Sequence, residues 1–511
     1  MPLLPRYTED RGSKQRNDLE PHAVLSHEGA IYESYAEIFA PYFAELVGTF
    51  ILTMTFLCNY SPSSDPVWAA TSNGFMVAAL VYAFGHISGG NLNPSVSISL
   101  IFAGRHTPRV AAKLCVAQTL GAILAAVLRM QISAQTSVDI GPFEDRSWAQ
   151  VGLVEVLYTA MISFVYLNCA ASPRNNPVGN QNGFTGLAVG FCFIASGYAA
   201  RDISHTVTNP AIAIGLTIVD AANSGMSTRG MKYLLFDILG AFVGAGMYRI
   251  VRPHEAGNPV SYLEPEQTIK DPVSAQIAAE FIGTFFLVFT KALNRLGQSA
   301  NLGPEAWSMA AVLSAMVYSL RGVSGAYFNP AVLLASWTSG CCFLPGRVAA
   351  FCVLTQIMAG LVAVSLYAAV AHEGVRVRVN EEETAGAVAF GECAFTFLMC
   401  YVVLATGASS TAGPKGRPNN IAGLTYGACQ TVGGFAIGNI SGSMLNPAVV
   451  LAFGGLNLLS LETDTWCFHY IAYQVLAALL ASAAFTATHS YAEINAARMK
   501  DEDNSLPRPA A

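Results

Sequence analysis

The chain has 511 residues, of which 53% are apolar and only 12% are charged, and its formal net charge is −6. Soluble domains carry about 25% charged residues, so this composition excludes a soluble globular protein, and the apolar content excludes a disordered chain. The negative net charge also disfavours nucleic-acid binding. What remains is a protein that crosses a membrane several times.

Apolar segments long enough to cross a bilayer, which takes about 20 helical residues, recur along the chain. The predicted fold class is an all-α polytopic membrane protein with twelve spans, at residues 36–58, 68–86, 110–130, 150–170, 183–200, 230–251, 273–294, 305–320, 347–370, 386–406, 420–438 and 465–487. The expected domains are a tail (1–35), a first six-helix unit (36–252), a polar linker (253–272), a second unit (273–490) and a second tail (491–511).

Lysine and arginine are unevenly distributed between the two sets of connecting segments. Segments on the side of the termini carry most of them, among them Arg11, Arg16 and Arg105, so the positive-inside rule predicts cytoplasmic termini. The first 35 residues lack the apolar stretch of a cleavable signal peptide. None of the eleven cysteines has metal-ligand spacing. We therefore expect a multi-pass protein of the plasma membrane with no metal and no cofactor.

Four short segments resemble one another, and each contains an Asn-Pro pair that recurs every 116 to 120 residues. Each pair follows a glutamate in an apolar stretch by 48 to 54 residues. The glutamates are Glu45, Glu155, Glu280 and Glu392, and the motifs are Asn93-Pro94-Ser95, Asn209-Pro210-Ala211, Asn329-Pro330-Ala331 and Asn446-Pro447-Ala448. Because each unit holds three helices, successive units enter the membrane from opposite faces. The repeat predicts inverted pairs of three-helix units, copied in tandem.

Each Asn-Pro pair predicts the start of a helix, since proline suits the first turn and asparagine can cap it. About ten apolar residues follow, which span about 15 Å, half the membrane core. Two such half-helices from opposite faces would meet at the midplane, with their positive ends and Asn amides at the centre of a pore. Non-helical backbone at that depth needs hydrogen-bond partners, and the glutamates are expected to accept its N–H groups.

These motifs resemble the aquaporin, or major intrinsic protein, family. Residues 44–50 and 279–285 are similar to its first helix, and residues 85–89 are similar to the loop before its first Asn-Pro pair. Gln118 and Gln356 resemble a position of its third helix. One unit of this family has six helices and two re-entrant half-helices, so the chain resembles two complete aquaporins fused in tandem.

The resemblance also implies a selectivity constriction in each half. Its positions are Asn73, Gly197, Thr206 and Ile212 in the first half, and Met309, Gly434, Ser443 and Val449 in the second. The family usually has arginine where this chain has Ile212 and Val449, and water-specific members usually have histidine where both halves have glycine. A wider, less polar opening is therefore expected. Asp237, where the family often has proline, is either a pore-lining acid or a hydrogen-bonded packing residue.

The expected function is a passive channel for water and small uncharged solutes of the glycerol or urea type, with one pore per half and no enzymatic activity. Family members are tetramers, so the resemblance implies a homodimer with four pores. The expected partners are water, small neutral solutes and membrane lipid, with no nucleic acid. Two alternatives stay open: a membrane scaffold or junction protein with closed pores, and a secondary transporter.

Overall fold

The structure is a computed structural model that describes residues 27–59, 66–132, 141–143, 146–176, 182–224, 228–255, 271–296, 302–342, 344–372, 374–375, 377, 382–412, 421–459 and 466–489. Every regular element within these ranges is a helix. Most of the two expected tails and of the expected linker lies outside the described residues.

The first half contains eight α-helices in the expected order. The six at the predicted spans are here called long helices and the two at the Asn-Pro motifs short helices. The long helices are α1 (His27–Asn59), α2 (Pro66–Ser88), α4 (Pro108–Ile132), α5 (Trp148–Tyr166), α6 (Thr185–Ala199) and α8 (Arg229–Val251). A π-helical segment, η1 (Leu167–Ala171), continues α5. The short helices are α3 (Pro94–Phe102) and α7 (Pro210–Ser224), which begin at the prolines of the first two motifs. α6 and α7 both have 15 residues, so the two names refer to these positions and not to length.

The second half repeats this order. Its long helices are α9 (Val273–Leu293), α10 (Leu302–Ser324), α12 (Gly346–Ala371), α13 (Ala385–Ala412), α14 (Ala422–Ser441) and α16 (Trp466–Thr488). Its short helices are α11 (Pro330–Thr338) and α15 (Pro447–Leu459). Each of the twelve predicted spans therefore corresponds to a helix, although α1 begins nine residues before the predicted start.

Nine helices, counted within the described ranges, are long and apolar enough to cross a membrane. The three other long helices, α2, α6 and α14, also lie at predicted spans. α6 has only 15 residues, and α2 and α14 carry serine, threonine, asparagine and glycine along their length. α6 is buried along most of its length, so it needs less apolar character than a helix surrounded by lipid.

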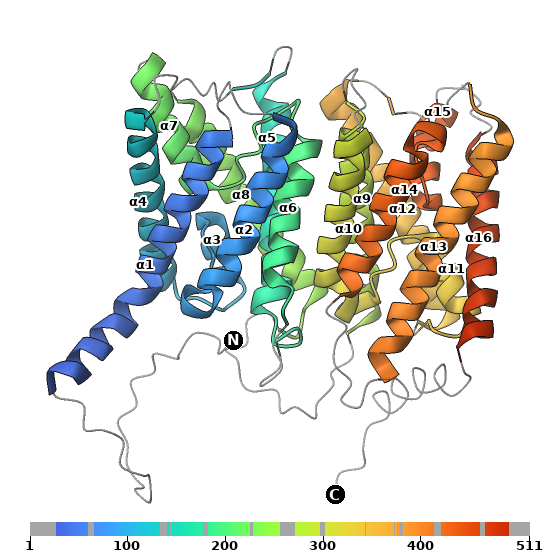
Figure 1. The fold of residues 1–511 in the computed structure, drawn as a ribbon, viewed down its shortest axis with the longest axis horizontal. Helices are drawn as coiled ribbons and strands as arrows, with labels where there is room; N and C mark the ends of the chain where they lie inside the picture. The colour runs from blue at the N-terminus through green and yellow to red at the C-terminus, as the bar shows by residue number, and fades with distance from the viewer. Residues whose placement is uncertain are drawn as a thin grey trace, which may run out of the picture.

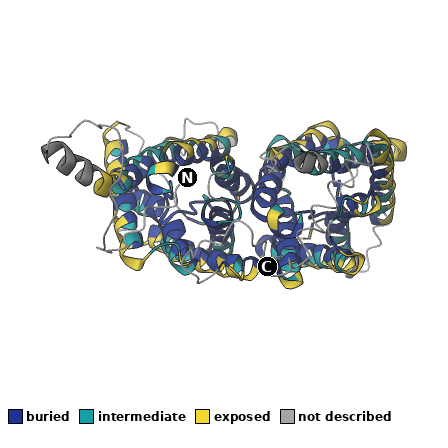
Figure 2. Ribbon diagram, turned by 90° about the horizontal axis from the view of Figure 1, so that it is seen from below, coloured by how far each residue is buried: buried dark blue, intermediate teal, exposed yellow. Residues whose placement is uncertain are grey.

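The two halves lie side by side, and each is a ring of helices around its half-helices (Figures 1 and 2). α1 begins and α16 ends at one face, here named the terminal face. α3 and α11 lie toward the terminal face, whereas α7 and α15 lie toward the opposite face (Figure 1). Each half thus brings two half-helices together from opposite faces, as the inverted repeat predicts.

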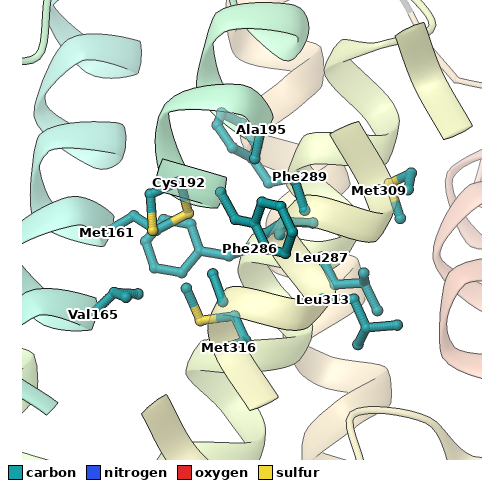
Figure 3. Packing of buried hydrophobic residues seen from close by; sticks show 14 of the residues in the cluster. Met161, Val165, Cys192, Ala195, Phe286, Leu287, Phe289, Met309, Leu313 and Met316 are labelled. Atoms are coloured by element: carbon teal, nitrogen blue, oxygen red, sulfur yellow. The ribbon is translucent and has the colours of Figure 1, made fainter. Parts of the chain in front are cut away.

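The halves meet where α5 and α6 pack against α9 and α10. Figure 3 shows Met161 and Cys192 of the first half facing Phe286 and Met316 of the second. The Ser308 hydroxyl adds a hydrogen bond across this junction, to the carbonyl of Ala195 at 3.0 Å. Leu287, Met309 and Leu313 lie on the other side of α9 and α10 (Figure 3). These two helices therefore serve both the junction and the interior of the second half.

Candidate functional site

Each motif asparagine caps the half-helix that follows it. Asn93 and Asn329 have extended backbone, and the Oδ1 atom of each accepts the backbone N–H two residues later at 2.9 Å. Asn209 and Asn446 accept in the same way, at 3.0 and 2.9 Å. The proline that follows loses nothing by lacking an N–H, because the first turn has no internal acceptor for one. All four half-helices begin where the sequence predicts.

The two loops of each half are tied together by a reciprocal pair of hydrogen bonds. Asn93 Nδ2 donates to the carbonyl of Thr208, and Asn209 Nδ2 donates to the carbonyl of Leu92, both at 2.9 Å. The second half has the same pair, from Asn329 to Leu445 at 2.8 Å and from Asn446 to Phe328 at 2.9 Å. An amide nitrogen carries two hydrogens, so each first-half asparagine keeps a second donor for a molecule between the helix ends.

The residue before each motif asparagine has a left-handed backbone, which is uncommon for any residue except glycine. The φ values are 50° at Leu92, 47° at Thr208, 53° at Phe328 and 52° at Leu445. The carbonyls of these four residues are the acceptors of the bonds between the loops. The unfavourable conformation is thus offset by the bond it makes possible, which is the pattern of strain at functional sites.

Each loop is also held by one buried glutamate. Glu45 has no exposed surface and accepts the backbone N–H groups of Asn91 and Leu92 at 2.9 and 2.7 Å. The Ser88 hydroxyl and the Gln118 amide donate to the same carboxylate at 2.6 and 2.7 Å. Four donors fill the accepting positions of a carboxylate, so Glu45 supports the loop, and catalysis has no part in this arrangement.

The other three glutamates are equally buried and repeat this arrangement. Their backbone donors lie at 2.8 to 3.1 Å: Val207 and Thr208 for Glu155, Tyr327 and Phe328 for Glu280, and Met444 and Leu445 for Glu392. Each also accepts a serine hydroxyl, from Ser204, Ser324 and Ser441 respectively. The four loops therefore share one hydrogen-bonded frame.

Sequence reasoning missed these serines. One stands five residues before each motif asparagine, at Ser88, Ser204, Ser324 and Ser441. Aligning the four repeats with one another would have shown this recurrence. It would also have pointed to Gln474, which donates to Glu392 from the last helix at 3.0 Å, as Gln118 does to Glu45 from α4.

The second triplet departs from the others, because Asp237 stands where α16 carries Gln474. Asp237 is fully buried, and its Oδ1 atom accepts the Thr159 hydroxyl at 2.9 Å. Its backbone carbonyl accepts the hydroxyl of Ser95, the motif residue that replaces alanine, at 2.8 Å. Within the described residues, Oδ2 has no hydrogen-bond partner. These contacts favour the packing role for Asp237 over the pore-lining role.

The second half encloses a cavity beside its pair of asparagines. Asn329 and Asn446 line it together with Met309 and Val449, two residues of the expected constriction. Leu287, Leu313, Met399, Tyr426, Gln430 and Met444 complete the wall. The cavity therefore joins the half-helix ends to the expected constriction through a largely apolar lining.

Residues of the expected first-half constriction are also buried, around the loop that precedes α7. Asn73 accepts the amide of Asn59 at 2.7 Å through Oδ1. Thr206 places its hydroxyl 3.5 Å from the carbonyl of Ser196, and Ile212 has no exposed surface. This constriction would therefore present one amide, one hydroxyl and one branched apolar side chain.

The glycines expected at the two constrictions face away from the loops. A Cβ atom on Gly197 would lie 2.8 Å from the Cβ atom of Ala70, and one on Gly434 would lie 2.5 Å from that of Ala306. Both glycines thus allow close packing between long helices. A Cβ atom on Gly433 would instead lie 3.2 Å from Ser443 Oγ. The fifth-helix positions of the two constrictions, Gly197 and Gly434, stay predictions.

Comparisons of the sequence with known protein families agree with this architecture. The sequence model of the major intrinsic protein family matches residues 29–251, 184–294 and 266–434. Aquaporin NIP1-1 of Zea mays is 31% identical over 226 residues, 43% of this chain and 75% of the relative. Aquaporin Z of Rhodopseudomonas palustris is 30% identical over 238 residues, which cover 42% of this chain and 95% of that relative. A solved aquaglyceroporin from Plasmodium falciparum has a TM-score of 0.38 at 18% identity, over 42% of this chain and 98% of that structure.

The fold and the matches together define the class as an integral membrane protein with many spans and paired half-helices. The chain belongs to the major intrinsic protein family. Its length and its repeated family matches show two copies of the family unit in tandem.

Proposed function

We propose that the protein is a passive channel for water and small uncharged solutes of the glycerol or urea type, with one pore in each half. The observation that carries this proposal is the reciprocal pair of Asn–carbonyl bonds, which occurs once in each half. Helix N-termini that converge in this way present positive dipole ends to the space between them. Such a space favours neutral hydrogen-bonding molecules and opposes cations.

The apolar residue after the second motif of each half supports a solute larger than water. Ile212 and Val449 stand there, and Val449 lines the second cavity. An arginine at this position would narrow the opening and add a fixed charge. Glycerol and urea therefore meet a wider passage than a constriction with arginine would offer.

Stopped-flow permeability of proteoliposomes to water, glycerol and urea tests the proposal directly. The expected result is flux of all three above that of empty vesicles, unchanged by a proton uncoupler. Water flux without glycerol or urea flux would overturn the solute class. Background flux from a folded protein would favour the scaffold alternative, and uptake abolished by the uncoupler would favour a secondary transporter.

A homodimer with four pores is part of the same proposal, and the junction inside the chain supports it. There α6 carries Ala195, whose carbonyl accepts the Ser308 hydroxyl of the second half, and Tyr198 one turn further on, with exposed fractions of 0% and 8%. By the repeat, α14 carries Val432 and Phe435 at these positions, and they are 48% and 60% exposed. The free face of α14 thus matches a face that the chain already uses for packing.

On the first half, α2 has an exposed face that matches the face of α10 buried at the junction. Ala311 and Tyr318 of α10 are buried at the junction, whereas Phe75 and Tyr82 of α2, at the matching positions, are 45% and 51% exposed. A second copy could seat its α14 against this α2. Native mass spectrometry in mild detergent should give a dimer, and the double variant Phe75→Cys with Phe435→Cys should form disulfide crosslinks between copies. A monomer at all concentrations would overturn this part.

Localisation in the plasma membrane with cytoplasmic termini completes the proposal. It rests on the lysine and arginine bias toward the terminal face, and the units proposed as channels remain residues 36–252 and 273–490. Epitope tags at either terminus should stain only after permeabilisation of the cells; staining of intact cells would reverse the orientation.

A further inference from the structure

A buried group of charged side chains lies at the opposite-face end of the second half. It consists of Lys291 at the end of α9, Arg295 just beyond it, and Glu305 near the start of α10. Lys291 Nζ lies 3.0 Å from Glu305 Oε1, and Arg295 Nε lies 2.9 Å from Glu305 Oε2. The side chains are 1%, 6% and 7% exposed, respectively. The group carries two positive charges and one negative charge.

These residues continue the wall of the second-half cavity. Lys291 follows Leu287 by four residues on α9, and Glu305 precedes Met309 by four residues on α10. Residues four apart share one face of a helix, and Leu287 and Met309 both line the cavity and face away from the junction (Figure 3). The Lys291–Glu305 pair therefore lies one helical turn, about 5.4 Å, beyond the expected constriction.

The same group holds the loop that carries the constriction residue Ser443. Lys291 Nζ donates to the carbonyls of Gly442 and Ser443 at 3.2 and 3.1 Å, and an Arg295 Nη atom donates to Gly442 at 3.0 Å. Ser443 Oγ is buried and has no hydrogen-bond partner within the described residues. The positive charge thus contacts the backbone of the expected constriction directly.

The first half has no charged residue at the matching positions of the sequence. By the repeat, these positions hold Phe56, Tyr60 and Ala69. The nearby polar contact there is neutral, between the amides of Asn59 and Asn73. The two halves therefore differ by a net positive charge beside the expected constriction.

We infer that Lys291, positioned by Glu305 and supported by Arg295, is a selectivity-determining residue that makes the second pore exclude cations more strongly than the first. It supplies, from α9, the positive charge that Val449 does not supply after the last motif. A unit charge in a site of low effective dielectric constant raises the energy of a nearby cation, whereas a neutral solute is little affected. This inference rests on the proposed channel function.

The test compares variants of Lys291 that differ in the net charge of the group. Two of them share the same substitution, Lys291→Met, and so lose the same hydrogen bonds. Lys291→Met lowers the net charge by one, whereas Lys291→Met with Glu305→Gln restores it through Arg295, and Lys291→Arg retains it. In a protein whose first pore is blocked by Asn93→Phe with Asn209→Phe, so that only the second pore conducts, potassium and proton permeability of proteoliposomes should rise about tenfold in the first variant and return to the original level in the other two. Water and urea flux should stay within about twofold in all three.

The matched control replaces a lysine near the opposite face of the protein whose side chain stacks on a tryptophan. Lys232 of α8 stacks on the ring of Trp148 at 4.1 Å, and Lys232→Met should leave cation permeability unchanged. If Lys291→Met does not fold, Glu305→Gln tests the same idea in the other direction, again with the first pore blocked. It raises the net charge of the group by one, so it should lower cation permeability below that of the blocked protein without this substitution.

The outcomes separate this inference from the proposed function. Unmodified protein without water flux would overturn the channel itself. Normal water flux with unchanged cation permeability in the folded Lys291 and Glu305 variants would overturn the inference alone. Equal loss of water flux in all Lys291 variants, including Lys291→Arg, would show that the group only holds the loop, and would also overturn it.

Discussion

The two halves share their loops but differ in the walls around them. Capping asparagines, left-handed residues and buried glutamates recur in both with distances that agree within a few tenths of an ångström. Around this frame, Met309, Gln430 and Lys291 of the second half stand where the first half has Asn73, Phe193 and Phe56. The loops and their glutamates must supply hydrogen-bond partners to non-helical backbone at membrane depth, so they tolerate little change. The helix residues that surround the loops have no such requirement and can diverge. On the proposed function, two copies in one chain can therefore serve different solutes.

The largest effect is expected from breaking the frame. Glu280→Ala leaves two backbone N–H groups, the Ser324 hydroxyl and the Gln356 amide without their acceptor, at about 1–3 kcal/mol for each buried group. We expect loss of folded protein, measured as monodisperse yield in detergent. The control is Met309→Asn, which introduces the residue found at the matching position of the first half, and this variant should fold normally. A well-folded Glu280→Ala variant with normal flux would show that the frame is dispensable.

Blocking one half tests whether the pores are independent. Asn93→Phe with Asn209→Phe should stop flux through the first pore and leave the flux of the second, which Asn329→Phe with Asn446→Phe should then remove. Stopped-flow rates, normalised to protein in the vesicles, provide the measurement. Complete loss of flux with the first pair alone, in a folded protein, would mean that the two halves do not conduct separately.

Adding charge to both walls should change selectivity more than rate. Ile212→Arg with Val449→Arg narrows both constrictions, so glycerol and urea flux should fall several-fold more than water flux. The second half already carries Lys291 nearby, and like charges repel, so Val449→Arg alone should cost more thermal stability than Ile212→Arg alone. A uniform loss of all fluxes would show that these positions do not select.

The smallest expected effect is a dependence of first-pore flux on pH, through His106. Burial lowers the pKa of His106, in the segment between α3 and α4, and this ring lies 3.5 Å from the Asn91 amide through Nε2. Since the folded pKa is below the unfolded value, stability falls as the pH falls below about 6.5. The second half has Cys342 at the matching position, 3.5 Å from the Tyr327 hydroxyl. Mild acid should therefore reduce first-pore flux alone, and His106→Gln should abolish the dependence.

The repeat made most of the fold predictable, because local patterns determine it. Apolar length places the helices, Asn-Pro places the half-helix starts, and the glutamates follow from the need to satisfy open backbone. The side of α6 that Gly197 faces could not be predicted from the motif spacing, since a shift of one residue turns a helical side chain by about 100° and only packing against Ala70 reveals it. The Lys291–Glu305 pair was not found from the sequence, because it joins two helices whose approach depends on the whole bundle.

The reciprocal bonds between the loops also constrain the order in which the protein can be made. Asn93 needs the carbonyl of a residue 115 positions later, which a ribosome adding about 5–20 residues per second supplies only after about 6–23 seconds. Glu45, by contrast, is synthesised before the loop it holds. The first half-helix of each unit, α3 and later α11, must therefore wait at the membrane with its glutamate bonds formed but without its partner half-helix. Assembly of each unit is complete only when its second half-helix has been synthesised and inserted. Because the chain has two units, this delay occurs twice.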